Sequence, residues 1–87
     1  SSSSAASDVY KRQELHEVRR RYQQDFIDNC NIWLGPFAAD GTVPLAGRWA
    51  ILGAAEALSE AVAAGALDKT NAEAELQRLI VATVKRR

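Results

Sequence analysis

The sequence has few of the residues on which most protein chemistry depends. Its 87 residues include one cysteine, one histidine and no methionine. A single cysteine excludes an internal disulfide, a four-cysteine zinc site and a cysteine-held iron–sulfur cluster, and a single histidine excludes a metal site built on a histidine pair. Basic and acidic residues are balanced at 11 each, so the basic excess typical of nucleic-acid and membrane-surface proteins is missing. We expect no cofactor and no metal site.

Segments that would direct the chain into a membrane or into catalysis are missing as well. The N-terminus lacks the basic start and apolar stretch of a signal peptide. No uncharged apolar run approaches the roughly 20 residues of a membrane span. The glycines form no phosphate-binding motif, and no base is spaced to activate a nucleophile. These absences predict a cytoplasmic protein that is not an enzyme and does not contact a membrane.

The first 13 residues differ in character from the rest. Residues 1–7 contain only serine and alanine, which offer nothing to bury and are typical of a disordered end. Residues 8–13, with the sequence DVYKRQ, resemble a translated sequencing adapter, and a native basic helix start is the alternative. We therefore expect residues 1–13 to be disordered and artefactual, and residues 14–87 to be part of a helical domain.

What the sequence does contain is a helical pattern with stop signals, which predicts an all-α fold with helices at about 9–34, 44–64 and 69–86. Gly35-Pro36 ends the first helix, because glycine tolerates the positive-φ C′ conformation and proline cannot continue the helix, and Gly65 ends the second as its C′ residue. Either Asp68 or Thr70 caps the third. In the first helix, residues spaced by three or four form one apolar stripe of Leu15, Val18, Tyr22, Phe26, Cys30 and Trp33.

The second helix is apolar on nearly every side, with a third face made of alanines. A helix of this kind is buried nearly all round, and so short a chain cannot cover it alone. We therefore predict that the last two helices form an antiparallel pair that completes a bundle with a second copy. The residues predicted at this homodimer seam are Ala50, Ile51, Ala54, Ala57, Leu58, Ala61, Leu76 and Ile80.

Three smaller features each have two interpretations. The run Arg19-Arg20-Arg21 is either a phosphate-contacting patch or, as we favour, a solvated helix face. His16 is either a pH-sensitive or ligand-binding residue or, as we favour, a surface residue. The aromatic residues either belong to the core or line a pocket for a small apolar effector. This pocket would be lined by Tyr22, Phe26, Cys30, Trp33 and Trp49.

Residues 40–84 resemble the C-terminal end of tetracycline-repressor (TetR) family transcriptional regulators. The sequence ILGAAEAL at 51–58 is similar to the small-residue centre of that family's long helix, GALD at 65–68 to the loop after it, and 74–84 to its last helix. The resemblance implies that the last two helices form a four-helix bundle with a partner, that the preceding helices line an effector pocket, and that a helix-turn-helix precedes them. The connection at 35–41 is longer than the family's usual one.

The sequence thus predicts the ligand-sensing and dimerisation fragment of a TetR-like repressor that contacts DNA only through a domain absent from this chain. The alternative is a free-standing helical protein-interaction module.

Overall fold

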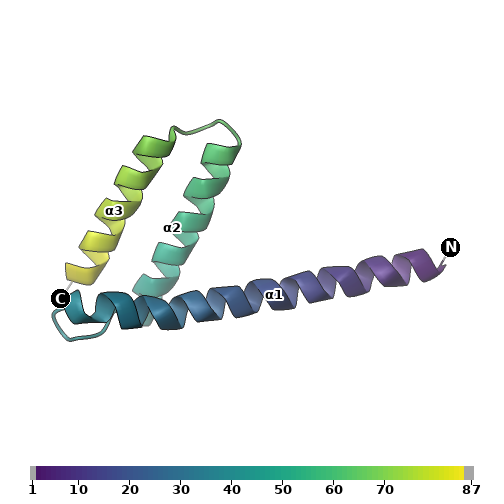
Figure 1. Ribbon diagram of the computed structural model, residues 1–87, viewed down its shortest axis with the longest axis horizontal. Helices are drawn as coiled ribbons and strands as arrows, with labels where there is room; N and C mark the ends of the chain where they lie inside the picture. Colours follow the sequence, from purple (N-terminus) through teal and green to yellow (C-terminus); the bar gives the residue numbers. More distant parts are fainter. Residues whose placement is uncertain (1, 86–87) are drawn as a thin grey trace.

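The computed structural model describes residues 2–85, with side chains from residue 7 onward. These residues form helix α1 (Ser2–Leu34), the short 3-10 helix η1 (Gly35–Phe37), helix α2 (Leu45–Ala63) and helix α3 (Lys69–Lys85). Figure 1 shows α1 as a long rod, with α2 and α3 rising from its C-terminal end as an antiparallel hairpin. The predicted all-α fold with three helices is confirmed.

Helix α1 begins earlier than the predicted start near residue 9. Residues 2–13 are helical, in contrast to the disordered end expected from their composition. No glycine or proline interrupts residues 1–34, so nothing in the sequence stops the helix. All residues from Ser7 to Tyr22 are exposed, and this free half of α1 extends away from the hairpin (Figure 1).

The core is small and lies mainly where the C-terminal half of α1 crosses the base of the hairpin. Its buried apolar residues there are Ile27, Cys30, Val43, Ile51, Leu52 and Val84, and Ala72 is buried between α2 and α3 near the tip. The predicted stripe on α1 is only partly correct, because Tyr22 and Trp33 are 63% and 64% exposed whereas Ile27, which was not in the stripe, is fully buried. The face that meets the hairpin is therefore rotated toward Ile27 and the half-buried Leu34.

The connection between α1 and α2 is fixed to the end of α1. The Asn31 side-chain oxygen accepts hydrogen bonds from the Thr42 hydroxyl at 3.0 Å and from the Val43 backbone N–H at 2.9 Å. Gly35 is buried, and a Cβ at this position would lie 2.8 Å from the carbonyl oxygen of Gly41. Gly35 is thus required for a close backbone approach, not for the positive-φ C′ conformation that was predicted, since only Gly41 and Gly65 have positive φ among the described residues.

The hairpin helices have well-defined ends. Pro44 precedes α2, whose first residue is Leu45, one later than predicted. After α2, the N–H of Ala66 donates to the Ala61 carbonyl and that of Gly65 donates to the Val62 carbonyl, which is a Schellman motif. The Asp68 carboxylate caps α3 by accepting from the Asn71 N–H at 3.2 Å. The stop at Gly65 is confirmed, and of the two predicted caps of α3 the structure shows Asp68, since Thr70 lies within the helix. The predicted end at residue 86 lies outside the described residues.

The molecule is far more extended than a compact chain of its length. Its radius of gyration is 16.9 Å, compared with about 12 Å for a compact domain of this size. Its accessible surface is 6659 Å², compared with about 5,000 Å² for a compact monomer of the same mass. A single copy therefore leaves much surface exposed that a partner is able to cover.

Candidate protein-interaction surfaces

One side of α2 is exposed along most of the helix and is almost entirely apolar. We call it the outer face of α2. Trp49 is 43% exposed here. A Cβ added to Gly53 would meet nothing within 4 Å. Because these residues are small apart from the tryptophan, another helix is able to approach closely. The outer face consists of Ala46, Trp49, Ala50, Gly53 and Ala57, all exposed, and each lies three or four residues from another member of the set.

The structure separates the residues that were predicted to form one dimer seam. Ala50 and Ala57 are exposed on the outer face of α2, and Ala54 and Ala61 lie half-buried beside it. Ile51 was placed in the seam wrongly, because it is 2% exposed and belongs to the core of its own chain. The three larger residues Leu58, Leu76 and Ile80 are half-buried, and they line grooves of the hairpin instead of the outer face.

A second apolar surface is a groove of about 310 Å³ between α2 and α3, toward the tip of the hairpin. We call it the hairpin groove. Lys69 and Glu73 stand at its edge with their charged atoms 3.9 Å apart. The groove is open and its lining is chiefly aliphatic, so it suits an apolar helix face better than a polar ligand. Its apolar lining comes from Ala55, Leu58, Val62, Ala63, Ala72 and Leu76.

A third surface lies at the opposite end of the hairpin, where the C-terminus of α1 and η1 meet α3. Leu34, Phe37, Ile80, Val81 and Val84 line a groove of about 320 Å³. Phe37 is 76% exposed there. This groove adds to the apolar surface that one copy leaves open.

The five residues of the predicted effector pocket do not gather around either groove. Tyr22, Trp33 and Trp49 are exposed, Phe26 is half-buried and Cys30 is buried. The single chain thus places three of these side chains on its surface, and an effector pocket stays a prediction.

Cys30 is buried at the junction of α1 with α2. Burial raises the pKa of its thiol, and the nearby Arg48 guanidinium lowers that pKa by a smaller amount. Arg48 also joins three parts of the chain, because its Nε donates to the Val43 carbonyl at 3.1 Å and its Nη1 donates to the Ile27 carbonyl at 3.3 Å. A buried thiol that stays protonated is a packing group and not a nucleophile.

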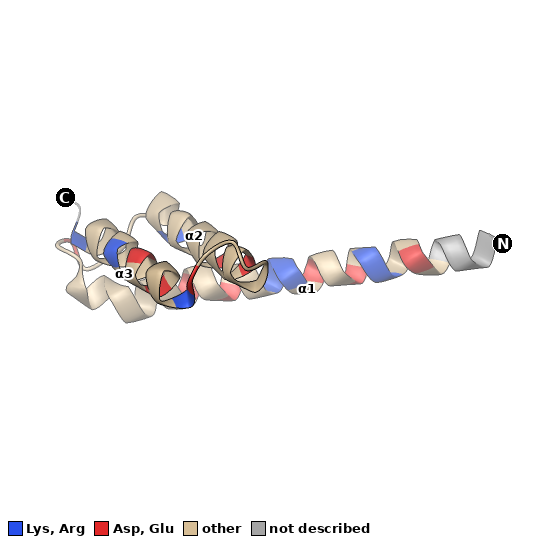
Figure 2. Cartoon of the chain, turned by 90° about the horizontal axis from the view of Figure 1, so that it is seen from above, with Lys and Arg blue, Asp and Glu red and all other residues tan. Residues whose placement is uncertain are grey.

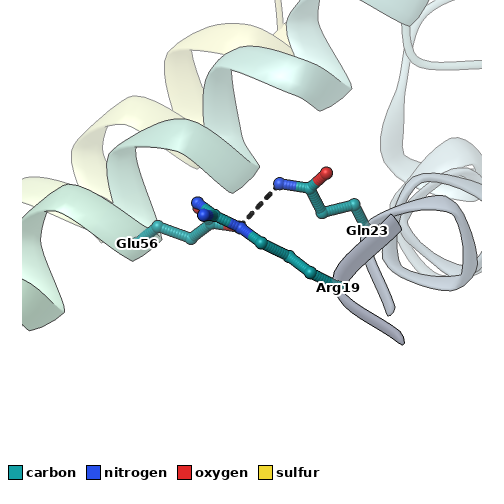
Figure 3. Close-up of polar contacts among 3 residues, drawn as sticks. All are labelled: Arg19, Gln23 and Glu56. Atoms are coloured by element: carbon teal, nitrogen blue, oxygen red, sulfur yellow. Dashed lines mark hydrogen bonds and ion pairs between the residues drawn. The ribbon is translucent and has the colours of Figure 1, made fainter. Parts of the chain in front are cut away.

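One polar cluster connects α1 to the middle of α2 (Figure 3). Glu56 accepts from the Arg19 guanidinium at 3.1 Å and from the Gln23 amide at 3.3 Å. The sequence analysis missed this cluster because it read the arginine run as a solvated face. Gln23 lies four residues before Ile27, and Arg19 four before Gln23, so both continue the buried face of α1. That spacing is the signal that would have found them.

Comparisons with known proteins give no further guide to this chain: no protein-family model, no curated protein and no solved structure matches it. No helix among residues 2–85 is long and apolar enough to cross a membrane. Within the same residues, no three potential metal-ligating side chains lie together.

Proposed function

We propose that this chain is a dimerisation module, and that it is the C-terminal ligand-sensing and dimerisation region of a TetR-like transcriptional repressor without its DNA-binding domain. The observation that carries the proposal is the bare outer face of α2, where five consecutive positions of one helix stripe are apolar or small and exposed. A contiguous apolar face exposed to water promotes association of a monomer, and the same kind of surface forms the buried core of protein interfaces.

Two further observations support a second copy as the partner. The accessible surface exceeds that of a compact monomer by about 1,600 Å², whereas a standard interface removes about 800 Å² from each partner. The chain also has no net charge, so two copies do not repel each other strongly. In the proposed dimer, the outer faces of two α2 helices pack against each other around a two-fold axis, since a symmetric dimer uses the same patch twice.

The test of this seam is Ala57→Glu, measured by sedimentation velocity over a range of concentrations. A carboxylate in the seam would be buried against the apolar helix of the other copy without a cation to pair with, so we expect the dissociation constant of the dimer to rise at least about tenfold. The matched control is Ala74→Glu, on an exposed position of α3, which should leave association unchanged. Equal association of both variants would refute the seam.

The transcriptional part of the proposal has a separate test. The resemblance of residues 40–84 to the TetR-family C-terminal region predicts a helix-turn-helix encoded upstream of Glu14 in the same gene. Sequencing that region of the gene from independent DNA decides the point. A start codon directly before Glu14, with no such motif, would overturn the repressor assignment and leave the dimerisation module in place.

The alternative is a free-standing helical interaction module. The observation in its favour is that the hairpin contains its own helix caps: Gly65 ends α2 and Asp68 begins α3. A free-standing module should form a dimer with sharp side-chain NMR signals, whereas a fragment with missing helices should bind hydrophobic dyes and lose near-ultraviolet dichroism.

A further inference from the structure

The free half of α1 and the hairpin groove are both unoccupied surfaces, and they complement each other. Leu15, Val18 and Tyr22 are exposed on α1 and spaced by three and four residues, so they form a ridge. The hairpin groove is the space between two antiparallel helices. We propose that residues 14–22, in the free half of α1 of one copy, lie in the hairpin groove of a second copy, and that the second copy does the same in return.

The way α1 packs in its own chain shows why this place is open. Arg48 and Glu56 both contact α1. Glu56 lies eight residues after Arg48 and three before Ser59 of the groove, so the three residues lie on the same side of α2. The chain's own α1 thus covers this side of α2 near the base of the hairpin and leaves the same side exposed near the tip. α1 runs away from the tip as a straight rod (Figure 1), and residues 1–34 contain no glycine or proline at which to bend.

The segments that form the two surfaces have net charges of opposite sign. The groove itself is lined by one lysine and one glutamate, whereas the whole segment 55–76 carries five carboxylates and one lysine, a net charge of −4, and residues 14–21 carry three cations and two carboxylates, a net charge of +1. Figure 2 shows cations alternating with carboxylates along α1, and carboxylates on both helices of the hairpin together with cations on α3. Arg19 already pairs with Glu56 within one chain, so an arginine of α1 beside an acidic edge of α2 is a contact that this sequence makes. Opposite potentials favour the paired orientation over others.

The accessible surface that one chain exposes is large enough for this contact in addition to the proposed α2 seam. The excess of about 1,600 Å² per chain is about twice what one partner contributes to a standard interface. The inference rests on the proposed function in that two copies must associate. It uses different residues from the outer face of α2, so the two contacts are separable by experiment.

The experiment is disulfide trapping between chains that each carry one added cysteine. Val18→Cys in one full-length chain and Ser59→Cys in another are mixed and oxidised, so that any link between these positions joins two copies. The matched control replaces Ser59→Cys with Gln77→Cys, on an exposed position of α3 that lines neither the hairpin groove nor the groove beside Phe37. The unaltered chain, with only the buried Cys30, gives the background.

We expect the Val18→Cys and Ser59→Cys mixture to link at least about tenfold faster than the control mixture, because an interface raises the effective concentration of the two thiols. Raising the salt concentration from 0.05 M to 0.5 M should lower this ratio, since salt screens the opposite charges. Equal rates in the two mixtures would overturn the inference.

Ala57→Cys distinguishes the two proposals, because the cysteines at position 57 of two copies should form a disulfide across the proposed α2 seam. Linking of Ala57→Cys alone would support the proposed function and overturn the contact of α1 with the groove. Linking of Val18→Cys with Ser59→Cys alone would support the α1 contact and overturn the seam. If neither pair links faster than the background, both proposals fail.

Discussion

Two glycines of this chain illustrate opposite reasons for a residue without a side chain. At Gly35 a Cβ would lie 2.8 Å from a backbone oxygen, whereas at Gly53 it would meet nothing within 4 Å. Gly35 is thus fixed by the approach of the loop to α1. Gly53, in the middle of α2, is a conformational cost to a single copy. Its absence of contacts agrees with an exposed helix side at which a partner's backbone comes close.

This difference predicts opposite effects of the same substitution. Gly35→Ala should lower the free energy of unfolding by about 1–3 kcal/mol, because the added methyl forces the loop away from α1. Gly53→Ala should raise it by about 0.5–1 kcal/mol in dilute protein, because alanine is the better helix former. Urea unfolding followed by circular dichroism measures both. A neutral Gly35→Ala would show that the loop yields without cost.

Cys30 predicts a dependence of stability on alkaline pH. Burial raises the pKa of its thiol above the ordinary 9.0, so the folded chain holds this proton more tightly than the unfolded chain. The resulting contribution is fully present below pH 9 and is lost as the pH rises toward the folded pKa. Cys30→Ala removes the titrating group. The stability advantage of the unaltered chain over this variant should therefore shrink above pH 9, measured by urea unfolding between pH 7 and pH 10.5. A constant difference over that range would show that the thiol does not titrate differently in the fold.

At the scale of whole elements, the ends of helices were easier to predict than their faces. Gly65 and Asp68 end and begin helices through local hydrogen bonds, which depend on residues close in sequence. The buried face of α1 depends on where the hairpin comes to lie. Two apolar stripes run side by side on that helix, and the sequence pattern favoured the one with Tyr22 and Trp33, whereas the hairpin covers the one with Ile27. The polar cluster at Glu56 was missed for the same reason, since Gln23 and Arg19 lie 33 and 37 residues before Glu56 in the sequence.

The Glu56 cluster is the polar connection between the free half of α1 and the hairpin, and it should limit the opening of α1. Glu56→Ala removes both acceptors, and amide hydrogen exchange in residues 15–23 should become about two- to threefold faster, because an exposed ion pair contributes about 0.2–1 kcal/mol. Glu60→Ala, one turn further along α2 and exposed, is the matched control and should leave these rates unchanged. Equal exchange in the two variants would show that apolar packing at Ile27 alone holds α1.

At the scale of the whole molecule, a single chain is a rod joined to a hairpin around a small core. Only seven apolar residues are buried among those described, and the largest apolar side chains lie on the surface. A core of this size stabilises a domain marginally. The proposed dimer would add to this stability, so the free energy of unfolding should rise with protein concentration.

The two tryptophans provide a direct measurement of that association. Trp49 is 43% exposed on the outer face of α2, and Trp33 is 64% exposed on α1 away from that face. In Trp33→Phe, Trp49 is the only tryptophan. Its quenching by acrylamide should fall about twofold or more between dilute and concentrated protein, because an aromatic residue at the centre of an interface is removed from water. In Trp49→Phe, which leaves Trp33 as the reporter, quenching should change little over the same range. If Trp49 is quenched equally at every concentration while sedimentation shows a dimer, the dimer is formed by a surface other than the outer face of α2.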